Sequence, residues 1–316
     1  SYDPPPSYVA CEGGSKNRDE AEYDSEYDEE NVKGEEEELT EEQKKKYLPK
    51  LVTGELVSAI AMTEPGVGSD LQSITTTALK DGNGYKINGA KTYISNGQTA
   101  DFIIVVAKTD PDERAKGISL MLLETEGAEG FQRGKKLDKI GLDAADTSEL
   151  FFDDVFVPAE NVLGGVEGKG FYQLMGELPQ ERLIIAMGAM TGIEKALETT
   201  MDFVKNRKAF GQTIWDFQNT QFVMADLKAR ATAARVFVND CIAKHLKKEL
   251  SVDTACMAKY WVTELQGEVV DKCLQFHGGA GFINDYPIAR MYRDSRITRI
   301  FGGSNEVMKM VIARGM

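Results

Sequence analysis

The sequence predicts a multi-domain α+β protein, in which a small β-barrel or sandwich is followed by a four-helix bundle, behind a disordered acidic N-terminal tail. Short strand-like runs separated by turn signals fill residues 56–161. Long helical patterns without such turn signals follow Gly164. With 316 residues, 42% of them apolar, the chain can bury a sizeable core.

Residues 1–42 form the predicted tail. They combine Pro4-Pro5-Pro6 with an acidic run through Glu38, and residues 1–50 hold 16 Asp/Glu against 7 Lys/Arg. So few apolar side chains cannot offset the entropy lost on ordering, which predicts disorder; a partner-binding acidic segment is the alternative. Outside residues 1–50 the chain is still mildly acidic, which argues against nucleic-acid binding.

The predicted middle β domain covers residues 43–165. Turn signals at Gly82-Asn83-Gly84 and Asn96-Gly97 separate strand-like runs, and no helix is predicted within it. Such short strands favour a small barrel or a sandwich. The runs are Ile74–Leu79, Tyr85–Asn88, Phe102–Ala107, Ile118–Leu123 and Leu150–Phe156.

The predicted helical domain covers residues 166–316, with helices at about 182–205, 217–248, 253–276 and from about 304. Pro179 suits the first turn of the first helix, because the N–H that proline lacks has no partner there. This start places Glu181 near the positive end of the helix dipole.

Composition limits the remaining classes of function. The sequence contains no run of 18 apolar residues, so no membrane span is expected. Cys11, Cys241, Cys256 and Cys273 show no paired spacing, so buried reduced thiols are expected. Only two histidines are present, so no metal site is expected. The sequence starts at Ser1, which leaves a removed targeting peptide open.

Five motifs carry the chemistry, and each also has a plain structural interpretation. Gly66 and Gly68, for example, could serve a turn, and they are no dinucleotide fingerprint because no helix follows and the third glycine is missing. Together and in order, the five motifs closely resemble those of the acyl-CoA dehydrogenase family, flavoenzymes that desaturate acyl-CoA thioesters. The motifs are TEPGVGSD, NGAKTYISNG, NRKAFGQ, LQFHGGAGF and IFGGSNE.

The resemblance covers residues 43–314 and is greatest to the long-chain branch, through GKGFYQLMGELPQERLIIA and RITRIFGGSNEVM. It implies an N-terminal helical domain, a middle β domain and a C-terminal four-helix bundle. It also implies FAD as cofactor, an acyl-CoA substrate, an electron-transfer flavoprotein as acceptor, assembly as a dimer of dimers and a mitochondrial matrix location.

The resemblance further implies a role for each matching residue. Met62, Thr63, Tyr93 and Ser95 would face the isoalloxazine ring, with Tyr93 where many relatives have Trp, and Ser69 would meet the acyl-CoA near its pantetheine. The remaining implied FAD contacts are Arg207, Phe210 and Gln218 on the ADP part in a neighbouring subunit, Gln275, Gly278 and Gly279 across the dimer interface, and Ser304 and Glu306.

The family chemistry requires a carboxylate that removes a proton next to the thioester carbonyl while hydride leaves the next carbon for flavin N5. The carbonyl oxygen must receive hydrogen bonds as enolate character develops. The resemblance assigns one donor to the Phe301-Gly302-Gly303 backbone and the other to a flavin ribityl hydroxyl. Medium- and short-chain members carry the base at the position of Gly302, whereas long-chain and isovaleryl members carry it where Glu181 stands. Glu181 is therefore the expected base, and the adjacent Arg182 would support the substrate site electrostatically.

One departure from the family is expected to matter. The acidic tail occupies the place of the N-terminal helical domain, so a fragment, an aberrant gene model and a divergent form all stay open. Without that domain we expect an exposed apolar patch and weak FAD retention. The rival functions are a short branched-chain dehydrogenase of isovaleryl type, an oxidase, and a catalytically silent flavin-binding paralogue.

Overall fold

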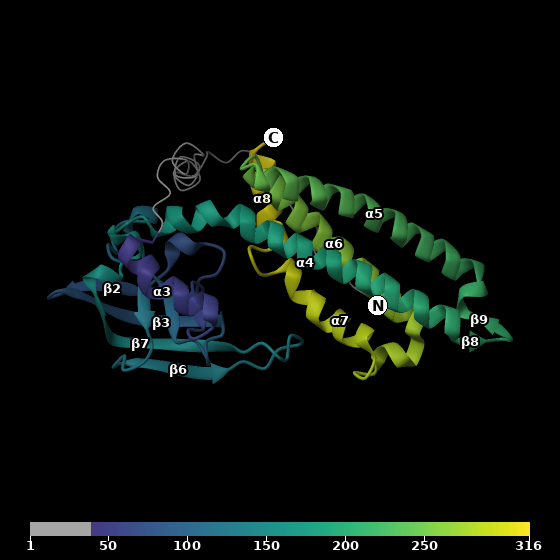
Figure 1. Ribbon diagram of the computed structural model, residues 1–316, viewed down its shortest axis with the longest axis horizontal. Helices are drawn as coiled ribbons and strands as arrows, with labels where there is room; N and C mark the ends of the chain where they lie inside the picture. The colour runs from purple at the N-terminus through teal and green to yellow at the C-terminus, as the bar shows by residue number, and fades with distance from the viewer. Residues whose placement is uncertain (1–38) are drawn as a thin grey trace, which may run out of the picture. The chain divides into compact units, whose positions relative to one another are not determined.

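A computed structural model describes residues 39–316, which form an antiparallel-rich β region and a helical C-terminal region (Figure 1). The predicted tail lies outside the described residues, apart from its last four positions. The β region contains α3 (Glu41–Thr53), β1 (Ser58–Ala61), β2 (Thr77–Asp81), β3 (Gly84–Ser95), β4 (Phe102–Lys108), β5 (Ile118–Glu124), β6 (Phe131–Lys136) and β7 (Thr147–Pro158).

These strands form a single curled sheet rather than two packed sheets. The sheet order is β1-β4-β2-β3-β7-β6, with β5 paired to β4. β2 and β3 form a hairpin at the turn predicted for Gly82-Asn83-Gly84, and Asp81 pairs with Gly84. The long antiparallel pair β3–β7 runs from Gly84↔Pro158 to Ser95↔Thr147, and irregular register within it marks β-bulges. The α+β class is confirmed, and the β part is an open half-barrel sheet.

A helix that the sequence analysis did not predict covers part of this sheet. α3 begins with a capping box, in which the Thr40 side chain and the Gln43 side chain each bind the other's backbone N–H. Tyr47 is buried, with its ring 4.4 Å from that of Phe102. The Gln43 amide also donates to the carbonyls of Glu160 and Val162, which ties α3 to the end of the β region.

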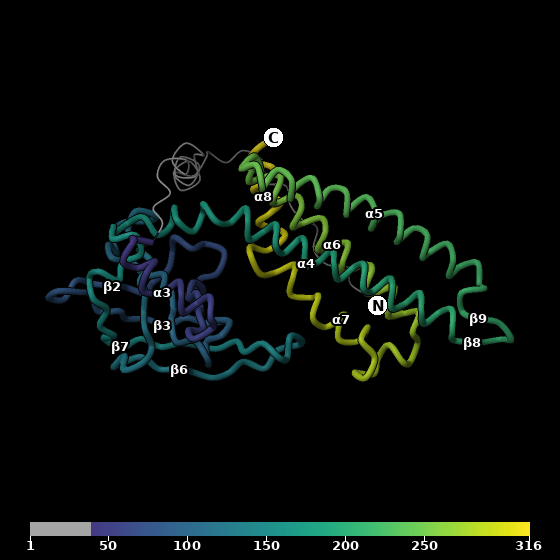
Figure 2. Tube along the Cα trace, in the orientation of Figure 1, coloured from purple at the N-terminus to yellow at the C-terminus, as the bar shows by residue number. Residues whose placement is uncertain are grey.

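The helical region is built on three long helices that lie alongside one another (Figures 1 and 2). Its core joins residues of α4, α5 and α6, such as Met190, Leu227 and Val269. The predicted helices are confirmed, and α7 was missed. The elements are α4 (Gly170–Asn206), β8 (Lys208–Ala209), β9 (Gln212–Thr213), α5 (Gln218–Leu246), α6 (Val252–His277), α7 (Pro287–Ser295) and α8 (Asn305–Arg314).

The predicted start of the first long helix is wrong. α4 begins at Gly170, nine residues before Pro179, so Pro179 and Glu181 lie in its interior. Phe171 and Leu174 pack against the sheet residue Ile118, and this tertiary burial extends the helix past the proline signal. The dipole argument for Glu181 therefore fails, because that effect is confined to the first turn.

Cys241, Cys256 and Cys273 are buried and unpaired, as expected, while Cys11 lies outside the described residues. Within residues 39–316 no helix is long and apolar enough to cross a membrane. In the same range, no group of three or more His, Cys, Asp or Glu side chains is placed to hold a metal ion.

Candidate active site and cofactor contacts

Glu181 is a half-buried carboxylate without a partner. No hydrogen bond or ion pair from any described residue reaches it. Burial raises the pKa of the Glu181 carboxyl above its ordinary value; Arg182 opposes this rise and Glu177 adds to it. An unpaired carboxylate with a raised pKa can accept a proton near neutral pH, as a general base must.

The Gly302–Gly303 turn lies against the same face of α4. A Cβ atom built on Gly302 would clash with Ile185 Cδ1, and Ile185 follows Glu181 by four residues, one helical turn. Both glycines have positive φ values, 62° and 85°, a conformation that side-chain-bearing residues adopt only with strain. The turn therefore packs on the face of α4 that carries Glu181, although Glu181 and Gly302 are 121 positions apart in the sequence.

This turn offers backbone donors. The N–H groups of Gly302, Gly303 and Ser304 have no acceptor among residues 39–316. Consecutive free N–H groups in such a turn form a concavity suited to an anion or an oxyanion. Ser304 is also the N-cap of α8, where its side chain accepts the N–H of Val307, and Glu306 lies exposed in the first turn.

Arg182, the next residue after Glu181, is buried. Its side chain is only 4% exposed and lies between α4 and α6, where one guanidinium nitrogen donates to Cys256 Sγ at 3.3 Å. Its Nε has no partner in the described part of the chain. Arg182 can therefore act on the site through its charge, whereas its described contacts are all inside the helical region.

A second group of predicted residues meets at one edge of the sheet. The N–H of Thr92 donates to the carbonyl of Thr63 at 2.9 Å, and Lys91 Nζ donates to the carbonyl of Met62 at 2.9 Å. Met62 and Thr63 thus lie beside the strand that carries Tyr93 and Ser95. Tyr93 is 69% exposed and has φ of 60°, a strained conformation that turns its ring outward.

The clamp that holds this edge was missed in the sequence analysis. Lys91 and Glu64 form a buried ion pair of 2.9 Å, and the Glu64 carboxylate also accepts the N–H groups of Thr75 and Thr76. Although burial opposes it, the Lys91 charge and these hydrogen bonds lower the pKa of Glu64 to about 2. Glu64 belongs to the motif TEPGVGSD and Lys91 to the motif NGAKTYISNG, but no feature of the sequence indicates that the two side chains pair. Ser69 lies exposed in the loop that follows β1.

The third group lies near the other end of α4. Arg207 caps the C-terminus of that helix, and the β8–β9 hairpin after it turns at Phe210-Gly211. Phe210 combines a positive φ of 53° with a side chain that is 96% exposed. Gln218 is the first residue of α5 and is also exposed. An aromatic ring held outward on a strained turn is available for contact with another molecule.

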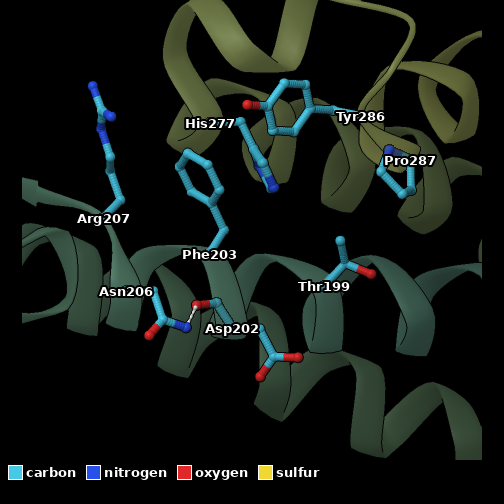
Figure 3. Close-up of a pocket in the computed structure, with 8 residues that line it drawn as sticks. All are labelled: Thr199, Asp202, Phe203, Asn206, Arg207, His277, Tyr286 and Pro287. Carbon is cyan, nitrogen blue, oxygen red and sulfur yellow. Dashed lines mark hydrogen bonds between the residues drawn. The ribbon is translucent and has the colours of Figure 1, made fainter.

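The end of α6 joins this third group. An open pocket of about 460 Å³ lies between the ends of α4 and α6 and the start of α7, and the rings of Phe203 and His277, stacked at 4.2 Å, form part of its wall (Figure 3). Gln275 is exposed nearby, and Gly278 and Gly279 have open space where side chains would stand. The residues lining the pocket are Thr199, Asp202, Phe203, Asn206, Arg207, His277, Tyr286 and Pro287.

The first and third groups do not meet within one chain. Glu181 and Arg207 are 26 residues apart on α4, which at 1.5 Å per residue is about 39 Å. That separation exceeds the length of an extended FAD molecule. The residues nonetheless fit such a cofactor in kind: an exposed tyrosine for a flat ring, free N–H groups, open glycine backbone and an exposed arginine for phosphates.

The comparisons identify the class of this architecture. Residues 59–155 match the acyl-CoA dehydrogenase middle domain, and residues 168–316 match the acyl-CoA dehydrogenase C-terminal domain. A crystal structure of acyl-CoA dehydrogenase from Geobacillus kaustophilus is 50% identical with a TM-score of 0.85, covering 87% of this chain and 73% of its own. The FAD complex of PigA is 33% identical with a TM-score of 0.83, covering 87% and 72%.

The chain belongs to the acyl-CoA dehydrogenase family. It is 51% identical over 277 residues to the long-chain specific acyl-CoA dehydrogenase of Sus scrofa mitochondria, covering 87% of this chain and 64% of that protein. The mitochondrial isovaleryl-CoA dehydrogenase of Pongo abelii is 42% identical over 277 residues, covering 87% and 65%. The chain thus spans less than two thirds of the length of these relatives.

Proposed function

We propose that this protein is an FAD-dependent dehydrogenase that introduces a double bond between the α and β carbons of long-chain acyl-CoA thioesters. The observation that supports the proposal is that the Gly302–Ser304 turn packs against α4 at Ile185, one helical turn from Glu181. A half-buried carboxylate without a partner and a turn with three free N–H groups thus lie on one face of α4. Removal of an α-proton beside a thioester carbonyl requires both a base and such donors.

In this proposal Glu181 removes the α-proton, and its raised pKa matches the task. N–H groups of the Gly302–Ser304 turn donate to the thioester oxygen as negative charge develops there, which makes the α-proton acidic enough to remove. Arg182 adds positive charge from inside the helical region. Bound FAD supplies the redox chemistry by taking the hydride from the β carbon.

The cofactor contacts are proposed as two sets from two copies of the chain. Met62, Thr63, Tyr93 and Ser95 would hold the flavin ring, with Ser304 and Glu306 beside it. The distance of about 39 Å along α4 supports a second copy as the source of the remaining contacts. We therefore propose a homo-oligomer, a dimer of dimers, in which these come from Arg207, Phe210, Gln218, Gln275, Gly278 and Gly279.

The finer assignments are also proposals. Ser69 would contact the pantetheine of acyl-CoA, and an electron-transfer flavoprotein would accept the electrons. The middle domain would span residues 43–165 and the helical domain residues 166–316. Mitochondrial relatives near 50% identity support a mitochondrial location.

The direct test compares Glu181→Gln with Glu177→Gln, an exposed glutamate one turn earlier on α4. Wild-type protein loaded with FAD is mixed anaerobically with palmitoyl-CoA, and bleaching of the flavin absorbance is followed. We expect bleaching in wild type and Glu177→Gln, and a rate about 10²–10⁴-fold lower in Glu181→Gln with FAD still bound. Bleaching at the wild-type rate in Glu181→Gln contradicts the assignment of the base.

The acyl chain is tested separately, because isovaleryl-type relatives place the base at the same position. The rates for palmitoyl-CoA and isovaleryl-CoA are compared in the wild-type protein. A higher kcat/KM for palmitoyl-CoA is expected. A higher value for isovaleryl-CoA assigns the protein to the branched short-chain substrates instead.

A further inference from the structure

Lys259 on α6 is a fully buried lysine directly behind the Gly302–Gly303 turn. Its side chain is 0% exposed, and Nζ donates to the carbonyl of Gly303 at 2.7 Å and to Asn305 Oδ1 at 2.9 Å. Among residues 39–316 no carboxylate forms an ion pair with it. Burying an ammonium group without a carboxylate is costly, so this lysine needs a reason beyond packing.

The turn is attached to α6 on both sides of the two glycines. Before it, Arg299 donates to Glu264 at 3.2 Å. After it, Asn305 is buried and donates to Glu264 at 2.7 Å and to Thr263 Oγ1 at 3.0 Å. Lys259 is the member of this network that reaches the turn itself, through the Gly303 carbonyl.

The bond to Gly303 has a geometric consequence. In a trans peptide the C=O and N–H groups point in opposite directions, and no cis peptide occurs in the described chain. With the Gly303 carbonyl held toward Lys259, the N–H of Ser304 is directed away from α6. The positively charged Lys259 ammonium, bonded to the Gly303 carbonyl oxygen, also polarises this peptide group. This polarisation makes the Ser304 N–H a better donor.

The charged groups around Lys259 keep a positive field at the turn. Burial and the charge of Arg182 on α4 together lower the pKa of Lys259 to about 8, against the opposing charges of Glu264 on α6 and Glu306 on α8. Lys259 thus remains largely protonated at neutral pH. Arg182 and Lys259 together are two buried cations behind the turn where enolate charge would develop.

We infer that Lys259 is a positioning residue, which orients and polarises the Gly302–Ser304 backbone so that its N–H groups stabilise the enolate-like substrate. The inference rests on the proposed function and deepens it, because Lys259 would act through the turn without touching substrate. It assigns a role to a residue that belongs to none of the five motifs.

The test compares Lys259→Met, which has similar length and no charge, with Lys259→Gln, which keeps a hydrogen-bond donor. Lys272→Met, an exposed lysine on the same helix, is the matched control. For Lys259→Met we expect kcat per bound FAD to fall about 10- to 100-fold, with KM within about threefold and FAD retained. Lys259→Gln should recover part of the loss, and Lys272→Met should match wild type.

A second readout separates this role from a purely structural one. The α-protons of acetoacetyl-CoA are acidic, and its bound enolate is followed by ultraviolet absorbance as pH is varied. The bound enolate should form at higher pH in Lys259→Met than in wild type. If Lys259→Met does not fold, the same shift in Lys259→Gln decides the question.

Two results overturn the inference: an unchanged kcat per bound FAD in Lys259→Met, with or without lower thermal stability, or an unchanged pH of enolate formation. Failure of the proposed function looks different. There, the wild-type protein itself would not desaturate any acyl-CoA. An effect of Lys259→Met on a working wild-type enzyme is needed for the inference to stand.

Discussion

Two glutamates of this protein show how burial can serve stability or chemistry. Glu64 is buried with Lys91 and two backbone N–H groups, and its pKa is lowered to about 2. Glu181 is half-buried with no partner, and its pKa is raised. The first carboxylate is therefore a fixed anion that holds the edge of the sheet, whereas the second can exchange a proton.

The difference follows from what surrounds each side chain. Glu64 lies beside two other segments of the β region, Thr75–Thr76 and β3, and its oxygens receive donors from both. Glu181 lies on a helix whose backbone donors are used within the helix, and no side chain of the described residues donates to its carboxylate. Stability and reactivity are thus separated between the β region and the helical region.

The largest expected effect comes from breaking the reactive member of the pair. Glu181→Gln should lower kcat by about 10²–10⁴-fold, because the amide cannot accept the α-proton. KM should change little, which marks an interaction made in the transition state. Steady-state rates with an artificial electron acceptor measure both values. An equal loss of kcat in Glu177→Gln would show that the rate depends on negative charge on this part of α4 and not on Glu181 as the base.

The next effect comes from breaking the structural member. Glu64→Gln should lower the free energy of unfolding by about 3–5 kcal/mol, because it leaves Lys91 buried without its counter-charge. Urea unfolding followed by circular dichroism measures the loss. The double variant Glu64→Gln with Lys91→Met should be less destabilised than Glu64→Gln alone. Equal or greater destabilisation of the double variant would contradict the pairing argument.

A smaller effect is expected at the far end of α4. Arg207→Ala should weaken FAD binding by about 1.5–3 kcal/mol, roughly 10- to 100-fold, if the arginine binds the cofactor's pyrophosphate in a second copy. FAD retained after gel filtration reports this. Lys205→Ala, an exposed cation one position before the end of the same helix, is the control and should retain FAD. Unchanged retention in Arg207→Ala removes Arg207 from the cofactor site.

The smallest effect concerns pH and stability. A raised folded-state pKa means that the folded protein holds the Glu181 proton more tightly than the unfolded chain, so this stability contribution is lost as pH rises above the ordinary value of 4.5. Glu181→Gln should then be slightly more stable than wild type at neutral pH and equal to it below pH 4.5. For Glu64 the sign is opposite, and stability should fall as pH drops from 4.5 toward 2. Melting temperatures across this range test both signs, and a destabilised Glu181→Gln at neutral pH contradicts the first.

Much of the fold could be predicted because its signals are local. The strand-like runs, the Gly82-Asn83 hairpin and the long helices each follow from periodicity or turn chemistry. The errors arose where tertiary contacts decide. Pro179 indicated a helix start, but packing of Phe171 on the sheet carries α4 back to Gly170. The missed elements have weak local signals, because β6 is a short edge strand, α7 is a short helix, and α3 is defined by caps and one buried tyrosine.

The site divides in the same way. Motifs pointed to Glu181 and Gly302, and the structure brings them to one face. Lys259 and Asn305 carry no local signal that predicts their partnership, because their hydrogen bond joins α6 to a residue 46 positions later. Arg182 stands beside Glu181 in sequence, yet the helix directs it to Cys256. Neighbours in a helix face different surroundings, and only the packing of α4 on α6 shows which.

The most direct test of the account is the pH dependence of single-turnover flavin reduction by palmitoyl-CoA. The rate for the wild-type protein should rise with pH through one ionisation whose apparent pKa lies above the ordinary glutamate value of 4.5, because Glu181 must be deprotonated to act. This rise should vanish in the residual rate of Glu181→Gln and persist in Glu177→Gln. A rise that persists unchanged in Glu181→Gln would contradict the claim that this unpaired carboxylate is the base.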